Sequence, residues 1–136
     1  MKKIFLCLIV ISIVVIFFGC KPDSDSVIIV SVTPSSDLVD GNSYDFTIVV
    51  QYVLASDNNG ELTIGFNNST SVNAFVALTA STMVVVKGSS EHTFNVNASA
   101  KDWQTEGDFQ AYVYLAEYPH RTPFSPYASD KEILTF

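Results

Sequence analysis

The sequence predicts an all-β fold, a two-sheet sandwich of seven or eight short antiparallel strands. From Val27 onward, apolar residues alternate with polar ones, and many of the apolar residues are β-branched or aromatic. Clusters of Gly, Asn, Asp, Ser and Pro interrupt these runs, whereas no window has the periodicity of an amphipathic helix. Residues 27–136 fall within the commonest domain size, about 100–150 residues, and contain no internal repeat, so we expect one domain.

Four strands are predicted by clear alternation of apolar and polar residues. The segment Tyr44–Leu54 has an apolar residue at almost every second position, as expected of a strand with one buried face. The next strand is Leu62–Phe66. Between the two, Asp57–Gly60 ends in Asn-Gly, which favours a hairpin because both residues tolerate positive φ. The other two strands are Thr93–Ala98 and Phe109–Leu115.

Shorter β-branched runs predict the remaining strands of the sandwich. These runs are Val27–Thr33, Val72–Thr79, Thr82–Lys87 and Lys131–Phe136. The first of them is apolar on both faces until Ser31, which is consistent with a strand at the edge between two sheets. Together with the four clearer strands, they give the strand number and turn spacing that are typical of a sandwich.

The N-terminus has the pattern of an export signal. Met1-Lys2-Lys3 is followed by 15 predominantly apolar residues, Ile4–Phe18, and then by the small residue Gly19. As a helix, this run would be roughly 22 Å long, which is short of a hydrocarbon core of about 30 Å. Residues 1–19 are therefore interpreted as a cleaved signal in preference to a membrane span.

The dipeptide Gly19-Cys20 resembles the lipobox of bacterial lipoproteins. In that family, the cysteine thiol receives a diacylglycerol and the signal is cleaved just before the cysteine. The resemblance implies that Cys20 is lipidated, that residues 20–26 form a short tether, and that acyl chains anchor the exported domain to a membrane of the cell envelope. The outer membrane or the cell surface is the favoured location. Two alternatives remain, an uncleaved N-terminal anchor and secretion with Cys20 as a free thiol.

Composition limits the partners of the exported chain. Loss of Lys2 and Lys3 with the signal leaves 5 of the 7 basic residues beside all 14 acidic ones, a formal charge of −9. Such a domain is unsuited to nucleic acids and to anionic lipid surfaces. Because Cys7 lies in the signal and Cys20 is the anchor, no thiol remains for an internal disulfide or a thiolate zinc site.

A second resemblance concerns the domain itself. Val32-Thr33-Pro34, Gly41 before a long strand, and Glu106-Gly107-Asp108-Phe109 before a penultimate strand are similar to a bacterial immunoglobulin-like or fibronectin-type module. The resemblance covers residues 27–136 and implies a sandwich, although the chain lacks the cysteine pair of antibody domains. A fold of this kind does not define a function.

No pattern in the sequence indicates catalysis, and no cofactor is expected. The chain has two histidines, His92 and His120, and contains neither G-x-S-x-G, nor H-E-x-x-H, nor a phosphate-binding glycine loop. The segment Asp57–Glu61 offers oxygen ligands, but it departs from the calcium-loop pattern and is explained by a turn. We therefore expect a non-catalytic binding or structural role, with no metal site.

The segment Tyr118–Asp130 is the first candidate for binding. It contains three prolines and the chain's single arginine, and it is long for a hairpin connection. Proline lowers the entropy lost on binding, and Tyr and Arg are enriched among interface hot spots. The candidate side chains are Tyr118, Arg121, Phe124 and Tyr127, which would recognise a protein or envelope component. The alternative is a packed connection whose aromatic residues close one end of the sandwich.

Tyr112 and Tyr114 are the second candidate. If Phe109, Ala111, Val113 and Leu115 face the core, these two tyrosines point outward on the opposite face of the same strand. Exposed paired rings, with Trp103 as a possible third, can stack on sugars and would make the domain a carbohydrate-binding module. The alternative is that neighbouring segments cover both tyrosines.

Overall fold

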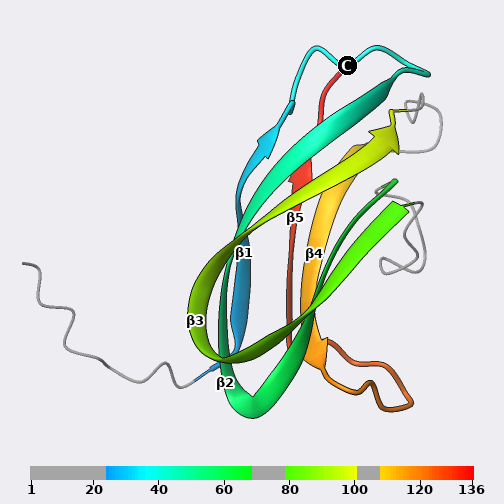
Figure 1. Cartoon of the computed structure of the whole chain (residues 1–136). Helices are drawn as coiled ribbons and strands as arrows, with labels where there is room; N and C mark the ends of the chain where they lie inside the picture. Colours follow the sequence, from blue (N-terminus) through cyan, green and yellow to red (C-terminus); the bar gives the residue numbers. More distant parts are fainter. Residues whose placement is uncertain (1–23, 69–78, 101–107) are drawn as a thin grey trace, which may run out of the picture.

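The computed structural model describes residues 24–68, 79–100 and 108–136, which form five β-strands and no helix (Figure 1). The strands are β1 (Ser26–Thr33), β2 (Ser43–Asn68), β3 (Thr79–Ser99), β4 (Phe109–Glu117) and β5 (Ala128–Ile133). All of their pairings are antiparallel, which confirms the predicted all-β class. Within this described part of the chain, no helix is long and apolar enough to cross a bilayer.

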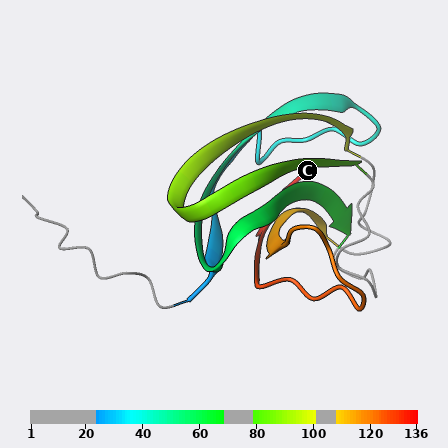
Figure 2. The same cartoon turned by 60° about the horizontal axis from the view of Figure 1, so that its bottom comes forward.

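The five strands belong to one sheet that curls around its core (Figures 1 and 2). One edge of β2 pairs first with β1 and, after a bend, with β4. The other edge of β2 pairs with β3 along both halves, and β5 pairs with β4. As a result, the half of the sheet that contains β1 folds over the half that contains β4.

A four-residue bulge marks the bend. Leu54 pairs with Gly88 and Asn59 pairs with Val86, so the segment 55–58 of β2 lies opposite a single residue of β3. Extra residues on one strand bend it and increase its twist. Gly88 has φ +129°, a conformation that side chains rarely allow, so β3 can turn at the same level.

The predicted hairpin at Asp57–Gly60 is wrong, because β2 continues through this segment. Gly60 does not have the positive φ that the hairpin requires. A Cβ atom at Gly60 would lie 3.1 Å from the Ala116 carbonyl oxygen and 3.1 Å from Leu54 Cδ2. Glycine is therefore needed here for the close approach of β2 to β4.

The same bend explains why the predicted strand number is too high. The predicted strands Tyr44–Leu54 and Leu62–Phe66 are two halves of β2. In the same way, Thr82–Lys87 and Thr93–Ala98 are two halves of β3. Five strands therefore occur in the described ranges, where the sequence predicted seven or eight over the whole domain.

Two other predicted boundaries need comment. The last strand was expected at Lys131–Phe136, but β5 begins at Ala128 and ends at Ile133, because its pairing with β4 begins at Leu115. The predicted strand Val72–Thr79 lies outside the described residues except for Thr79, the first residue of β3. The prediction for β1 is accurate to one residue.

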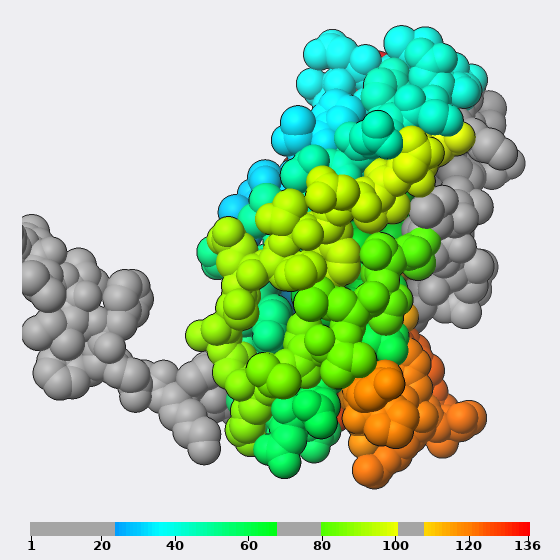
Figure 3. Space-filling model, in the orientation of Figure 1, coloured from blue at the N-terminus to red at the C-terminus, as the bar shows by residue number. Residues whose placement is uncertain are grey.

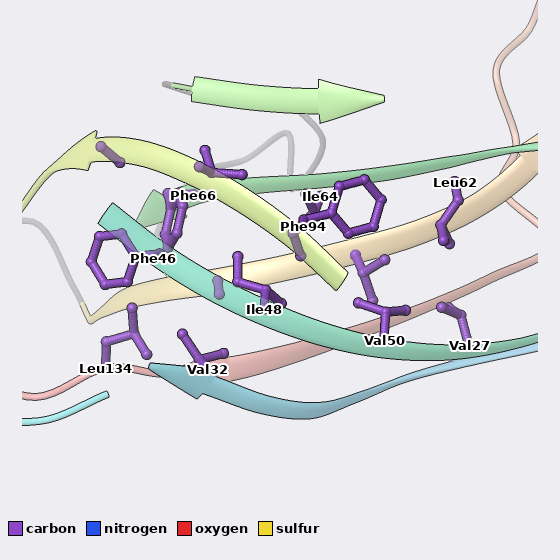
Figure 4. Packing of buried hydrophobic residues seen from close by; sticks show 14 of the residues in the cluster. Val27, Val32, Phe46, Ile48, Val50, Leu62, Ile64, Phe66, Phe94 and Leu134 are labelled. Carbon is purple, nitrogen blue, oxygen red and sulfur yellow. The ribbon is translucent and has the colours of Figure 1, made fainter. Parts of the chain in front are cut away.

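Both halves of the sheet bury apolar side chains in one core (Figure 4). Phe46 and Phe66 come from opposite halves of β2, and their ring centroids are 4.6 Å apart. The largest fully buried side chains are Phe46, Phe66, Phe109, Ile48, Leu54, Leu62, Ile64, Leu115, Val50 and Val113. Full burial of such a side chain contributes roughly 1.5–3 kcal/mol, so apolar packing is the main source of stability.

Contacts between β1 and β5 close the curled sheet. The backbone N–H of Ile29 donates a hydrogen bond to the Asp130 carboxylate, at 2.8 Å. Beyond the ends of both strands, the Leu38 N–H donates to the Thr135 carbonyl oxygen, at 3.1 Å. The two strands therefore lie side by side although they share no ladder of paired residues.

Candidate functional site

The β4–β5 loop, residues Tyr118–Tyr127, projects from the lower end of the domain (Figures 1 and 3). It accounts for most of the predicted segment Tyr118–Asp130, whose last three residues belong to β5. The Tyr127 N–H donates a 2.8 Å hydrogen bond to the Leu115 carbonyl oxygen and closes the base of the loop. The loop is thus a long connection between two paired strands.

Two polar contacts join the loop to β2 near its bend. The Tyr127 hydroxyl donates a short hydrogen bond to the Asp57 carboxylate. Partial burial, followed by the hydrogen bond and the negative charge of Asp57, raises the pKa of Tyr127 to about 12. His120 Nε2 lies 2.9 Å from Glu61 Oε1. These contacts occupy the acidic side chains of the segment that the sequence had assigned to a turn.

The arginine of the loop has a different environment. Arg121 Nε lies 2.8 Å from Glu117 Oε1, four residues earlier in the chain. The Arg121 side chain is nevertheless 83% exposed, whereas that of Glu117 is 24% exposed. An exposed ion pair of this kind contributes about 0–1 kcal/mol, so the guanidinium group can exchange this partner for another at little cost.

Phe124 attaches the loop to the outer face of β4. Its ring makes edge-on contacts with Tyr114 and His120, at centroid distances of 5.1 and 5.0 Å. Even so, Phe124 remains 38% exposed, and Tyr118 at the start of the loop is 46% exposed. The loop therefore presents two aromatic rings to its surroundings while one of them also packs on the sheet.

Tyr112 and Tyr114 do lie on the face of β4 opposite the core, but they are not exposed. They are 5% and 9% exposed, and their rings stack at a centroid distance of 6.5 Å. Burial, with a smaller effect from Tyr114, raises the pKa of Tyr112 to about 12. The prediction of an open aromatic pair is therefore wrong, and the alternative in which both tyrosines are covered is correct.

Two hollows flank the loop, and both are small. One, of about 240 Å³, lies between the loop and β4, and the other, of about 280 Å³, lies between the loop and the bend of β2. Glu117, His120 and Arg121 line both hollows. Small-molecule sites usually occupy about 300–1,000 Å³, so these dimensions suit contact with a surface better than enclosure of a ligand.

A third hollow, of about 300 Å³, lies on the outer face of β1, β2 and β3. Its lining contains one carboxylate, that of Glu91, which accepts a 3.1 Å hydrogen bond from Gln51 Nε2. Within the described ranges, no three His, Cys, Asp or Glu side chains form a group that could hold a metal ion. The hollows beside the β4–β5 loop therefore contain more charged and titratable side chains than the third hollow does.

Four of the predicted binding residues lie on the loop. Arg121, Phe124 and Tyr127 line the hollow beside β4, and Tyr118 and Arg121 line the hollow beside the bend of β2. Cys20 and Trp103 lie outside the described residues. The sequence did not identify the side chains that fix the loop, which are Asp57, Glu61, Glu117 and His120. Their charges were visible, but only the fold places the bend of β2 beside the end of β4.

Comparison with known proteins assigns no family to the chain. No protein-family model matches the sequence, and a search of curated proteins also finds no match. The proposals below therefore depend on the N-terminal sequence and on the geometry of the β4–β5 loop.

Proposed function

We propose that the protein is a lipid-anchored lipoprotein of the bacterial cell envelope with a non-catalytic binding role. Its signal would be residues 1–19, its lipidated residue Cys20, and its tether residues 20–26. The β4–β5 loop would recognise a protein or another envelope component. The basic start, the apolar run and Gly19-Cys20 support the anchor, and the exposed side chains of the loop support recognition.

The observation that carries the binding role is the combination of fixed contacts and exposed side chains in one loop. Tyr127 and His120 attach the loop to β2 through Asp57 and Glu61. A loop that is already ordered loses less entropy when it binds. The exposed side chains are two aromatic rings and a guanidinium group, and Tyr and Arg are enriched at interface hot spots.

The same geometry supports a role without catalysis. The two basic side chains of the loop are already paired, Arg121 with Glu117 of β4 and His120 with Glu61 of β2. A catalytic base requires a proton-donating substrate group within hydrogen-bond reach in a site that holds the substrate. Neither small hollow beside the loop provides such an enclosure.

An immunoglobulin-like or fibronectin-type sandwich is part of this proposal. Its support is that the two halves of the curled sheet face each other across one core, as two layers do in a sandwich. In such domains, loops at the ends of the sheets commonly carry recognition. The carbohydrate-binding alternative is not proposed, because the burial of Tyr112 and Tyr114 removes the surface on which it depended.

Site-specific photo-crosslinking in native membranes tests the binding role. A photoreactive residue replaces Ser125 in the loop, and a matched protein carries it at Ser36, an exposed serine beyond the far end of β1. We expect a specific adduct at position 125 that is absent at position 36. The adduct should weaken in the double variant Tyr118→Ala/Phe124→Ala but persist in the control variant Val84→Ala/Val86→Ala, which alters exposed valines of β3. Equal labelling at positions 125 and 36 would refute recognition by the loop.

A further inference from the structure

The chain enters the domain at the bend of β2. Asp25 Oδ1 accepts hydrogen bonds from the backbone N–H groups of Ala55 and Ser56, at 2.7 and 3.1 Å. Burial alone would raise the pKa of Asp25, but these hydrogen bonds and the nearby Lys87 together lower it. The carboxylate therefore binds the bulge in its charged form, just before β1 begins at Ser26.

The β4–β5 loop is fixed to the same bend. Asp57, the residue after Ser56, accepts the hydrogen bond of Tyr127, and Glu61 contacts His120. Both views of the fold place the start of β1 and the β4–β5 loop at the same end of the domain (Figures 1 and 2). Asp25, just before β1, and the β4–β5 loop are thus attached to the same bend of β2.

The length of the tether limits how far this end can lie from the membrane. Asp25 lies five positions after Cys20, and this stretch of chain spans at most about 18 Å when fully extended. β1 has eight residues, so its far end lies about 26 Å from its start, at about 3.3 Å per residue. An acylated Cys20 therefore brings the loop end closest to the lipid.

The exposed chemistry of the loop suits the polar region of a bilayer. Aromatic side chains such as Tyr118 and Phe124 favour the boundary between headgroups and acyl chains. Arg121 has a long apolar stem and a charged group that binds phosphate oxygens. Asp57, Glu61 and Glu117 make the surrounding surface acidic, which favours zwitterionic over anionic lipid.

We propose that the envelope component contacted by the β4–β5 loop is the zwitterionic lipid surface of the membrane that holds the anchor. The inference rests on the proposed function, because it requires acylated Cys20 and a binding loop. Anchoring keeps the loop at a high effective concentration near the lipid, so a contact that is weak in free solution is sufficient. The contact would hold the domain upright on its loop end.

Fluorescence quenching in vesicles tests the lipid contact. The acylated protein carries Ser125→Cys or, as the matched control, Ser36→Cys; with Cys20 acylated and Cys7 lost with the signal, each variant has one free thiol. Each thiol is labelled with an environment-sensitive fluorophore, and the protein is reconstituted into phosphatidylcholine vesicles that contain a headgroup-labelled quencher lipid. We expect fluorescence loss at position 125 and none at position 36. Tyr118→Ala/Phe124→Ala should reduce the loss at position 125.

The outcomes separate this inference from the function on which it rests. If intact mass shows no acyl chain on the protein, both the anchor and the lipid contact are refuted. If the protein is acylated but position 125 is not quenched, or both positions are quenched equally, the lipid contact alone is refuted. An adduct with a protein at position 125 in native membranes, without quenching in pure lipid, would instead assign the loop to a protein partner.

Discussion

Substitution of Gly60 by alanine tests whether β2 runs unbroken through the Asn-Gly dipeptide. The new Cβ would lie 3.1 Å from the Ala116 carbonyl oxygen, so β2 and β4 must separate by a few tenths of an ångström. Overpacking of this kind costs about 1–3 kcal/mol. Alanine also lowers the conformational entropy of the unfolded chain, which offsets about 0.4–1 kcal/mol of this loss in stability. The expected net loss in the free energy of unfolding is about 1–2 kcal/mol.

The neighbouring variant Asn59→Ala provides the control. Asn59 is exposed and lies in extended strand opposite Val86, so its replacement should change the free energy of unfolding by no more than about 0.5 kcal/mol. In a hairpin turn, both Asn59 and Gly60 would need positive φ, and alanine at either position would cost about 1–2 kcal/mol. Equilibrium urea unfolding, monitored by circular dichroism, distinguishes the continuous strand from the hairpin turn. A loss for Asn59→Ala as large as that for Gly60→Ala would refute the continuous strand.

Three further variants probe the core, the contact of Asp25 with the bend of β2, and the contact of Tyr127 with the same bend. Phe66→Ala should lower the free energy of unfolding by about 3–5 kcal/mol, measured in urea, because its ring is fully buried against Phe46. Because the pKa of Asp25 is lowered in the folded protein, its carboxylate stabilises the fold above pH 3.8, and this contribution is lost as pH falls through the folded pKa. Asp25→Asn should therefore flatten the acid limb of a stability-versus-pH curve. The pKa of Tyr127, raised to about 12, gives stability that is complete below pH 10 and lost as pH rises toward 12, so Tyr127→Phe should flatten the alkaline limb.

Each of these variants has a contrary result. An unchanged urea midpoint for Phe66→Ala would mean that the two halves of β2 do not share a core. An acid limb as steep in Asp25→Asn as in the wild type would contradict a charged contact between Asp25 and the bend. For Tyr127→Phe, an unchanged alkaline limb would show that its hydroxyl ionises as it does in an unfolded chain.

Alternation of apolar and polar residues predicted the buried faces well. Phe46, Ile48 and Val50 in β2, and Val113 and Leu115 in β4, all face the core as expected. This success has a local cause, because successive side chains of a strand point to opposite faces whatever the strand pairs with. The predicted all-β class follows from the same period.

The continuity of β2 could not be predicted in this way. Asn-Gly is a local signal for a hairpin, but contacts from distant segments determine the outcome here. Asp25 binds the N–H groups of Ala55 and Ser56, and Ala116 of β4 packs closely on Gly60. These contacts from distant segments favour a bulge over a turn at this position.

The candidate site was predicted in part for a similar reason. Composition indicated the β4–β5 loop, since prolines, aromatic residues and the single arginine gather there. The burial of Tyr112 and Tyr114 had a weaker signal, namely that β4 has no charged residue before Glu117, which is typical of a strand covered on both sides. The position of the loop at the same bend as Asp25 depends on the fold and could not be read from the sequence.

The most direct test of the anchor, on which the proposed function depends, is the intact mass of the protein extracted from its native membranes. We predict the mass of residues 20–136 plus acyl chains for the wild type, and no acylated form for Cys20→Ser. A wild-type mass without acyl chains, or the same mass increment in both proteins, would contradict lipidation at Cys20 and with it the placement of the loop at the membrane.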